Sequence, residues 1–138
     1  MKYIVGAYAT SPFLSKNKNL ELTFYDKLIE SIPEIMGLEI PFFGHNIHRF
    51  GSDFLINILR PEWNNVLTCI PGTMENLSIN PKYGIASDDD FFRMEAVSMY
   101  QRANQTVQEI NGFFGKKSFI AVQIVSAPSF PIKGVKSS

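Results

Sequence analysis

Cysteine is nearly absent from this sequence, since Cys69 is the only one among 138 residues. A single cysteine cannot form a disulfide within the chain, which excludes a disulfide-stabilised secreted domain and favours a reducing compartment. The apolar run at residues 3–9 is short for the core of a signal peptide and lacks a convincing basic region and cleavage site. These observations predict a cytoplasmic protein.

The sequence also has no excess of positive or negative side chains. The 13 lysine and arginine residues equal the 13 aspartate and glutamate residues, and no basic stripe is present, so no nucleic-acid partner is expected. No apolar run is long enough to cross a bilayer, so no membrane partner is expected either. Neither a Gly-x-Gly-x-x-Gly sequence after the first apolar run nor a P-loop occurs, which argues against a nucleotide site.

What the sequence does contain is an alternation of short apolar runs with helical patterns. The apolar runs predict strands over residues 3–9, 35–40, 63–70 and 118–126. Helices are expected between them, over residues 20–31 with Asn19 as the cap, 53–59 with Ser52 as the cap, and 91–111. Residues 73–87 are predicted to form a long connection. Two apolar stripes support the first and last helices: Leu20, Phe24, Leu28 and Ile32, and Phe92, Ala96, Met99, Ala103, Val107 and Ile110.

Strands that alternate with helices predict a parallel sheet with right-handed crossovers. The repeat of about 35 residues suits a (β/α) barrel unit. We therefore expect an α/β fold, a parallel (β/α) half-barrel of four strands and three helices that corresponds to the N-terminal half of a TIM barrel. Residues 1–138 would be a single partial domain, truncated after the fourth strand. A small doubly wound sheet is the alternative.

A half-barrel has two open sheet edges and an apolar concave face. The fold prediction therefore implies a poorly soluble monomer, a homodimer that completes the barrel, or a truncated gene product.

Glu39 is the sharpest candidate for chemistry because it is a carboxylate inside an apolar strand, between Leu38 and Ile40. Parallel α/β proteins bind their ligands at the carboxyl ends of the strands, which is where Glu39 would lie. A carboxylate there needs a cationic, hydrogen-bond-donating or metal partner. We interpret Glu39 as the candidate catalytic residue; a structural ion pair with a lysine or arginine is the alternative.

Two histidines follow on a loop, His45 and His48. They could share a metal ion if the segment turned helically, but no third ligand accompanies them, so no metal site is predicted in this chain. Each is a weaker candidate for a general acid or base, and exposed or capping histidines are the alternative. Position at the strand ends also marks a set of substrate-binding candidates: Thr10, Phe43, Gly72, Thr73, Gln123 and Ser126.

Two further features, the aspartates at residues 88–90 and Cys69, are interpreted as structural and not as parts of a functional site. Residues 88–90 are three aspartates just before the longest predicted helix. We interpret them as stabilising the free N–H groups and the positive dipole end of that helix, and not as metal ligands. Cys69 has no activating base beside it in the sequence, and a buried strand thiol is inert.

Five segments resemble a known family: residues 1–12, 37–42, 68–74, 84–89 and 126–128. They are similar to an uncharacterised bacterial family that is catalogued as a domain of unknown function and is related to the xylose-isomerase-like TIM barrels. The resemblance covers nearly the whole chain, but only about the first half of a family member. The resemblance implies that the metal-binding carboxylates and histidines come mostly from later strands. Within this chain, it implies a functional role only for Glu39.

The function is therefore unknown, and two hypotheses remain open. The complete parent would be a sugar or sugar-phosphate isomerase or epimerase that acts on a small polar substrate, with a divalent metal (Mn²⁺ or Mg²⁺) in the full-length protein and no cofactor in this chain. Alternatively, the chain is a non-catalytic truncated product, or a half-barrel that binds a small ligand by assembly. This chain alone is expected to be inactive.

Overall fold

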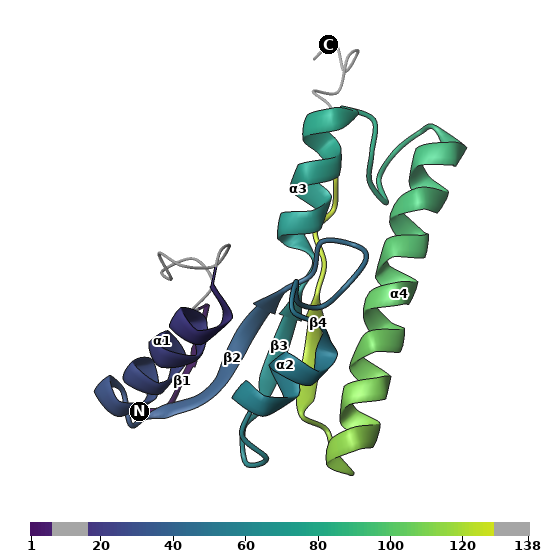
Figure 1. Cartoon of the computed structure of the whole chain (residues 1–138). Coiled ribbons are helices and arrows are strands. Elements are labelled where there is room, and N and C mark those ends of the chain that lie inside the picture. Colours follow the sequence, from purple (N-terminus) through teal and green to yellow (C-terminus); the bar gives the residue numbers. More distant parts are fainter. Residues whose placement is uncertain (7–16, 129–138) are drawn as a thin grey trace.

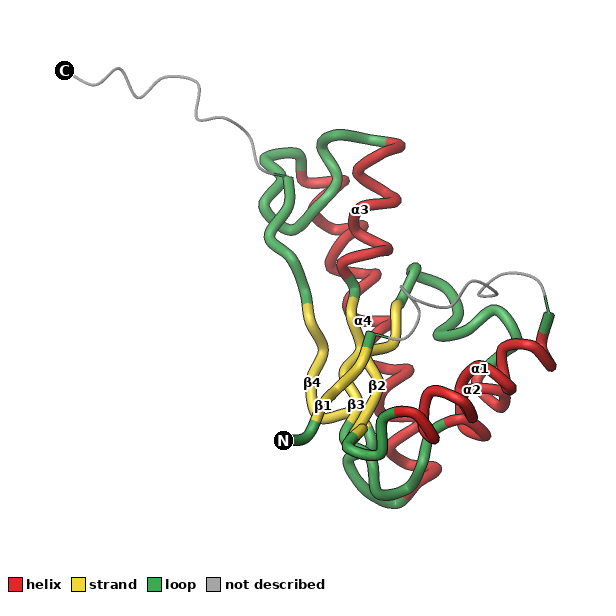
Figure 2. Tube along the Cα trace, turned by 90° about the vertical axis from the view of Figure 1, so that its left-hand side faces the viewer, coloured by secondary structure: helices red, strands yellow, loops and turns green. Residues whose placement is uncertain are grey.

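The computed structural model describes residues 1–6 and 17–128, which form a parallel sheet with helices packed on one side (Figure 2). The elements, in chain order, are β1 (Tyr3–Val5), α1 (Lys18–Ser31), β2 (Ile35–Pro41), α2 (Ser52–Ile58), β3 (Asn65–Thr68), α3 (Ile70–Ile79), α4 (Asp90–Phe114) and β4 (Phe119–Gln123) (Figure 1). None of these described helices is both long and apolar enough to cross a membrane.

The sheet has the order β1-β2-β3-β4, and every neighbouring pair is parallel. This confirms the predicted α/β class with a four-stranded parallel sheet, which is consistent with a half-barrel. The strands are shorter than predicted, because β3 ends at Thr68 and β4 at Gln123. The predicted continuation of the first strand into residues 7–9 lies outside the described residues.

The two faces of the sheet have opposite environments. Leu38, Ile40 and Leu67 point toward the helices and are fully buried. Glu39 lies beside Val66, and Val66 lies beside Ala121, so these three side chains share the other face, which is called the helix-free face below. Glu39 and Val66 are half-buried and Ala121 is exposed, because no described helix covers this side of the sheet (Figure 2).

Asn65, at the buried start of β3, joins β2 to Ser118, the residue just before β4. Its Oδ1 accepts a hydrogen bond of 2.9 Å from Leu38 N, and its Nδ2 donates bonds of 3.1 Å to both oxygens of Ser118. Close approach of the chain requires Gly37 in β2, because a Cβ there would lie 1.8 Å from the Asn64 carbonyl oxygen. The apolar pattern predicted the strands but gave no signal for this polar crosslink.

The long helix α4 was predicted well. Ala96, Met99, Ala103, Val107 and Ile110 are buried along the expected stripe. The helix extends past its predicted end at residue 111, to Phe114, because the residue that caps it is the left-handed Gly115 (φ 63°).

The caps of the first two helices were predicted wrongly. Asn17, not Asn19, caps α1 by accepting hydrogen bonds from the backbone N of Asn19 and Leu20. The buried positions of α1 are Glu21 and Tyr25, whereas Leu20 of the predicted stripe is 44% exposed. In α2 the cap is Gly51 at φ 87°, so Ser52 is already inside the helix.

Helix α3 replaces part of the predicted third strand and of the loop that was expected after it. Ile70 belongs to the predicted strand over residues 63–70, and residues 73–79 belong to the predicted connection. Proline at the start of α3 is pre-organised for a first helical turn, where its missing N–H costs nothing. Gly72 allows α3 to begin directly against β2, because a Cβ there would lie 2.5 Å from the Phe42 carbonyl oxygen. The helix therefore extends past the carboxyl ends of the strands (Figure 1).

Candidate functional site at the carboxyl ends of the strands

Glu39 lies on the helix-free face, near the carboxyl end of β2. Its side chain is half-buried, and the described part of the chain offers it no hydrogen bond or ion pair. The lysine or arginine partner of the alternative interpretation is therefore not found among these residues. The arrangement leaves the carboxylate available to a partner or ligand that approaches the face.

Gln123 follows on the same face, one step toward the carboxyl ends. Pro41 pairs with Thr68, and Thr68 pairs with Gln123, so strand alternation places these residues on the side of Glu39. The Gln123 backbone is fixed, since its carbonyl accepts a hydrogen bond of 2.9 Å from Cys69 N. Its exposed amide and the half-buried Glu39 carboxylate are thus two accessible polar groups on the helix-free face, whereas Thr68 is fully buried.

His48 is bound to a residue that the sequence did not suggest. Its Nε2 lies 2.7 Å from Oε1 of Glu21 in the first turn of α1. Its Nδ1 accepts a hydrogen bond of 3.1 Å from Phe50 N, so Nδ1 carries no proton and Nε2–H donates to the carboxylate. Both ring nitrogens are therefore occupied, and the ring lies against Phe54 with centroids 4.7 Å apart.

The Glu21 side chain is completely buried, and none of the residues that the structure describes gives its second oxygen, Oε2, a hydrogen bond. The bond from His48 and the positive end of the α1 dipole offset part of the cost of burying a carboxylate. Burial and the nearby Glu21 charge both raise the pKa of the Tyr25 hydroxyl, so this phenol stays protonated beside the pair. No periodicity argument reveals such a contact, because Glu21 and His48 are 27 residues apart in the chain.

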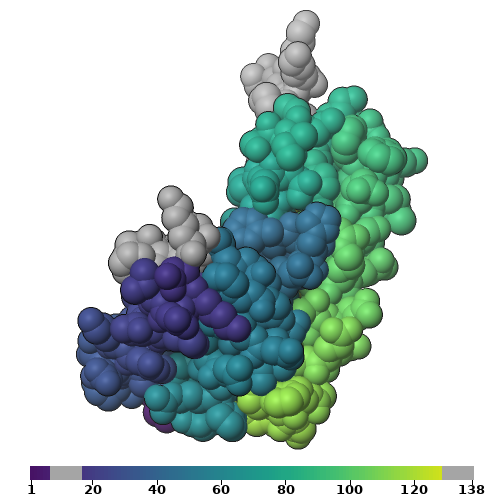
Figure 3. All heavy atoms as spheres, viewed as in Figure 1, coloured from purple at the N-terminus to yellow at the C-terminus, as the bar shows by residue number. Residues whose placement is uncertain are grey.

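The structure separates the two histidines of the predicted loop. His45 is exposed and lines a hollow of about 370 Å³ beneath α3, whereas His48 lines a smaller one of about 110 Å³. Phe43, 47% exposed, belongs to both hollows. The loop that carries these residues lies directly below α3 in Figure 3. The larger hollow is completed by Glu75, Asn76 and Ile79.

No group of three or more potential ligands (His, Cys, Asp or Glu) gathers anywhere in the described ranges. Glu39, His45 and His48 therefore do not form a metal centre with one another. Glu75 is an additional carboxylate near His45 for which the sequence gives no signal, because α3 itself is not predicted from it.

Thr73 and Gly72 have structural roles in this arrangement. Thr73 Oγ1 donates to the Cys69 carbonyl at 2.9 Å and lies 3.0 Å from the Tyr100 hydroxyl. Tyr100 in turn donates to the Val125 carbonyl at 3.2 Å. This network joins α3, α4 and the chain beyond β4, and Thr73 is fully buried within it.

The remaining candidates lie apart. Ser126 is exposed beyond the end of β4, and Thr10 lies outside the described residues. Burial raises the pKa of the Cys69 thiol to about 11, so this cysteine is protonated at neutral pH, as expected for an inert thiol. A larger hollow of about 580 Å³ lies at the amino ends of the strands, where Met1, Glu34 and Trp63 line it, far from Glu39.

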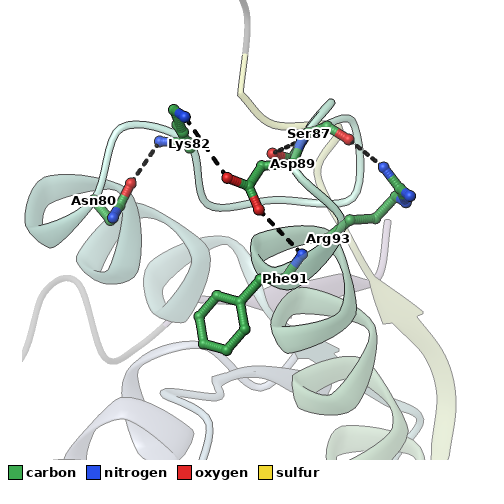
Figure 4. Close-up of polar contacts among 6 residues, drawn as sticks. All are labelled: Asn80, Lys82, Ser87, Asp89, Phe91 and Arg93. Carbon is green, nitrogen blue, oxygen red and sulfur yellow. Dashed lines mark hydrogen bonds and ion pairs between the residues drawn. The ribbon is translucent and has the colours of Figure 1, made fainter.

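Within residues 88–90, Asp89 caps α4 and Asp90 lies in its first turn, so the interpretation of this run as a helix start is confirmed. Asp89 is the N-cap, and its Oδ1 accepts a hydrogen bond of 3.1 Å from Phe91 N (Figure 4). Lys82 lies 3.6 Å from the other Asp89 oxygen, and Arg93 pairs with Asp90. The carboxylates of Asp89 and Asp90 are therefore engaged at the start of α4.

Comparison with known proteins gives two matches. The model of a family described as a domain of unknown function, DUF4862, matches residues 4–136. An uncharacterized protein of Salmonella typhimurium, STM3670, is 33% identical over 126 residues. The alignment covers 91% of this chain and 40% of that protein, so the chain spans less than half the length of the curated relative it matches. No solved structure matches the chain significantly.

Proposed function

Since the chain belongs to the DUF4862 family of domains of unknown function, we propose that it is the N-terminal half of a (β/α) barrel whose mouth binds a small polar substrate such as a sugar. The observation that carries the proposal is the position of Glu39. Its carboxylate stands without a described partner on the helix-free face, near the carboxyl end of a parallel strand. Barrels place catalytic groups at this end, on the side of the sheet that becomes the interior.

Two features of the sheet support a barrel over a doubly wound fold. All of its described helices pack on one side, whereas a doubly wound sheet has helices on both faces (Figure 2). The strand order β1-β2-β3-β4 follows the chain without reversal, as in a barrel, while doubly wound sheets contain a switch point. The relationship to the xylose-isomerase-like barrels is part of the proposal.

In the complete protein, we propose isomerisation or epimerisation of a sugar or sugar phosphate. Glu39 would act as a base that takes a proton from a carbon next to a carbonyl group and returns it during the rearrangement. Gln123 would hydrogen-bond a substrate hydroxyl from the same face, and Phe43 would cover the mouth. The proposed location is the cytoplasm, and the proposed partners do not include nucleic acid or membrane.

A divalent metal, Mn²⁺ or Mg²⁺, is part of the proposal for longer family members only. The described residues supply Glu39 as a single carboxylate, which does not fit a complete site. Any further ligands would come from the rest of the longer protein, so the proton transfer assigned to Glu39 does not depend on a metal here.

The separation of the candidates favours a second possibility for this chain by itself. His48 has both ring nitrogens bonded, and the hollow that contains His45 does not include Glu39. By itself, a chain with this arrangement would not turn over a sugar. It would either bind a small ligand after assembling with another half-barrel, or have no catalytic role.

The experiment uses a longer family member in which a glutamate aligns with Glu39. We expect turnover of at least one aldose, ketose or sugar phosphate, with or without added Mn²⁺ or Mg²⁺, and a loss of about 100-fold or more in kcat after Glu→Gln at that position. A matched control is Asp→Asn at the position of exposed Asp88. Unchanged kcat in the first variant would remove Glu39 from the mechanism, and inactivity of the parent on the whole panel would refute the isomerase proposal.

A further inference from the structure

We propose that the helix-free face and the two open edges of the sheet bind a second copy of this chain, so that two four-stranded sheets close into one eight-stranded barrel. β4 of each copy would pair in parallel with β1 of the other. The inference rests on the half-barrel arrangement of the proposed function but not on its chemistry.

The outer side of β4 has backbone groups ready to pair. The Gln123 carbonyl accepts a hydrogen bond from Cys69 N, so the backbone of Gln123 faces β3. Backbone groups alternate in direction along a parallel strand, which turns those of Val122 and Ile124 away from β3. Among the described residues β4 is the last strand in the sheet, and β1 is the first.

Both edges are apolar and carry few of the features that keep sheet edges apart. Ile120 and Ile124 are 52% and 50% exposed along the β4 edge, and Tyr3 and Ile4 are 45% and 38% exposed on β1. Proteins usually protect such edges with lysine, proline or charged side chains, yet residues 119–125 contain none of these. Exposed edges of this composition are templates for strand pairing.

A second copy fits these edges because its strands would run in the same direction and would bring the total to eight. In an all-parallel sheet, β4 of one copy and β1 of another can pair in the same sense as the pairs within each copy. Two such junctions join four strands to four strands and close the ring, since eight is the number at which side chains just fill a barrel interior. The chain has no net charge, so two copies do not repel each other strongly.

The assembled barrel would bring together two copies of Glu39. β2 and its symmetry mate would be opposite one another, and side chains from alternate strands fill the same interior layer. Two carboxylates in that narrow space repel each other. We therefore expect Glu39→Gln to strengthen the dimer.

Sedimentation equilibrium of the full chain over a range of concentrations tests the proposal. We expect a monomer–dimer equilibrium that ends at twice the 15.6 kDa mass of one chain. Ile120→Lys together with Ile124→Lys should raise the dissociation constant by at least about tenfold, and Glu39→Gln should lower it. The matched control is Ile79→Lys on α3, an isoleucine that is 79% exposed and far from either edge, which should leave it unchanged. Circular dichroism establishes that each variant is folded.

Several results would overturn the proposal. A monomer at every concentration would do so, as would growth beyond the dimer, because open edge-to-edge addition forms filaments and not a closed ring. Equal effects of the edge variant and of Ile79→Lys would exclude the edges as the interface. A longer family member that turns over no sugar would refute the proposed reaction and leave this dimer intact, so the two failures are distinguishable.

Discussion

At the scale of single residues, the buried pair between Glu21 and His48 shows most clearly what the sequence could not reveal. Glu39 was noticeable because a carboxylate interrupts an apolar run. Glu21 interrupts nothing, because it sits in a helix with mixed composition, and its burial depends on a histidine from another loop. His48 was singled out as a possible acid or base, and the structure instead binds both of its nitrogens.

This pair leads to a prediction about stability. Replacing His48 with Phe keeps an aromatic ring beside Phe50 and Phe54 but leaves the buried Glu21 carboxylate without a donor. We expect a loss of about 3–5 kcal/mol in the free energy of unfolding, measured by urea denaturation, because an unpaired buried charge is costly.

The control is the double variant with Glu21→Leu as well. Removing both partners of a buried pair is often neutral, so most of the lost stability should return. If the double variant were no more stable than His48→Phe alone, the loss would come from ring packing and the Glu21 charge would be irrelevant to it.

At the scale of elements, predictability depends on whether the signal is local. Helix α4 has a long apolar stripe and acidic residues at its start, and both were visible in the sequence, whereas its end at Gly115 was placed a few residues too early. Helix α3 was missed because proline and glycine at residues 71–72 indicate a turn. In the structure they fit the first turn of a helix that packs closely on Phe42. Only the tertiary contact distinguishes the two interpretations.

Asp89 gives a test at this scale. Asp89→Ala removes the acceptor of Phe91 N at the start of α4, and we expect a loss of about 1 kcal/mol in the free energy of unfolding. Asp88→Ala is the matched control, because Asp88 is exposed and the described structure gives it no hydrogen bond or ion pair; its effect should stay within about 0.5 kcal/mol. Equal losses would mean that helix-dipole effects, and not the capping hydrogen bond, stabilise this terminus.

At the scale of the whole molecule, the parallel sheet and the location of Glu39 were predictable, whereas the relation among the candidate residues was not. The repeat of strand and helix determined the topology, and the alternation of side chains along β2 placed Glu39 opposite Leu38 and Ile40. Whether His45, His48 and Glu39 face one another depends on the path of the loop at residues 42–51 and on α3, neither of which leaves a periodic signal. The result is a sheet whose helix-free face carries, between two apolar edges, a carboxylate for which residues 1–6 and 17–128 provide no partner.

The most direct test is a crystal structure of a longer DUF4862 protein. We expect the region aligned with residues 1–128 to form the first four strands of a closed eight-stranded barrel. Its next strand would be parallel to β4, and the glutamate that aligns with Glu39 would point into the interior. An open sheet with helices packed over the Glu39 side would contradict it, because that face could then be neither a barrel interior nor a substrate site.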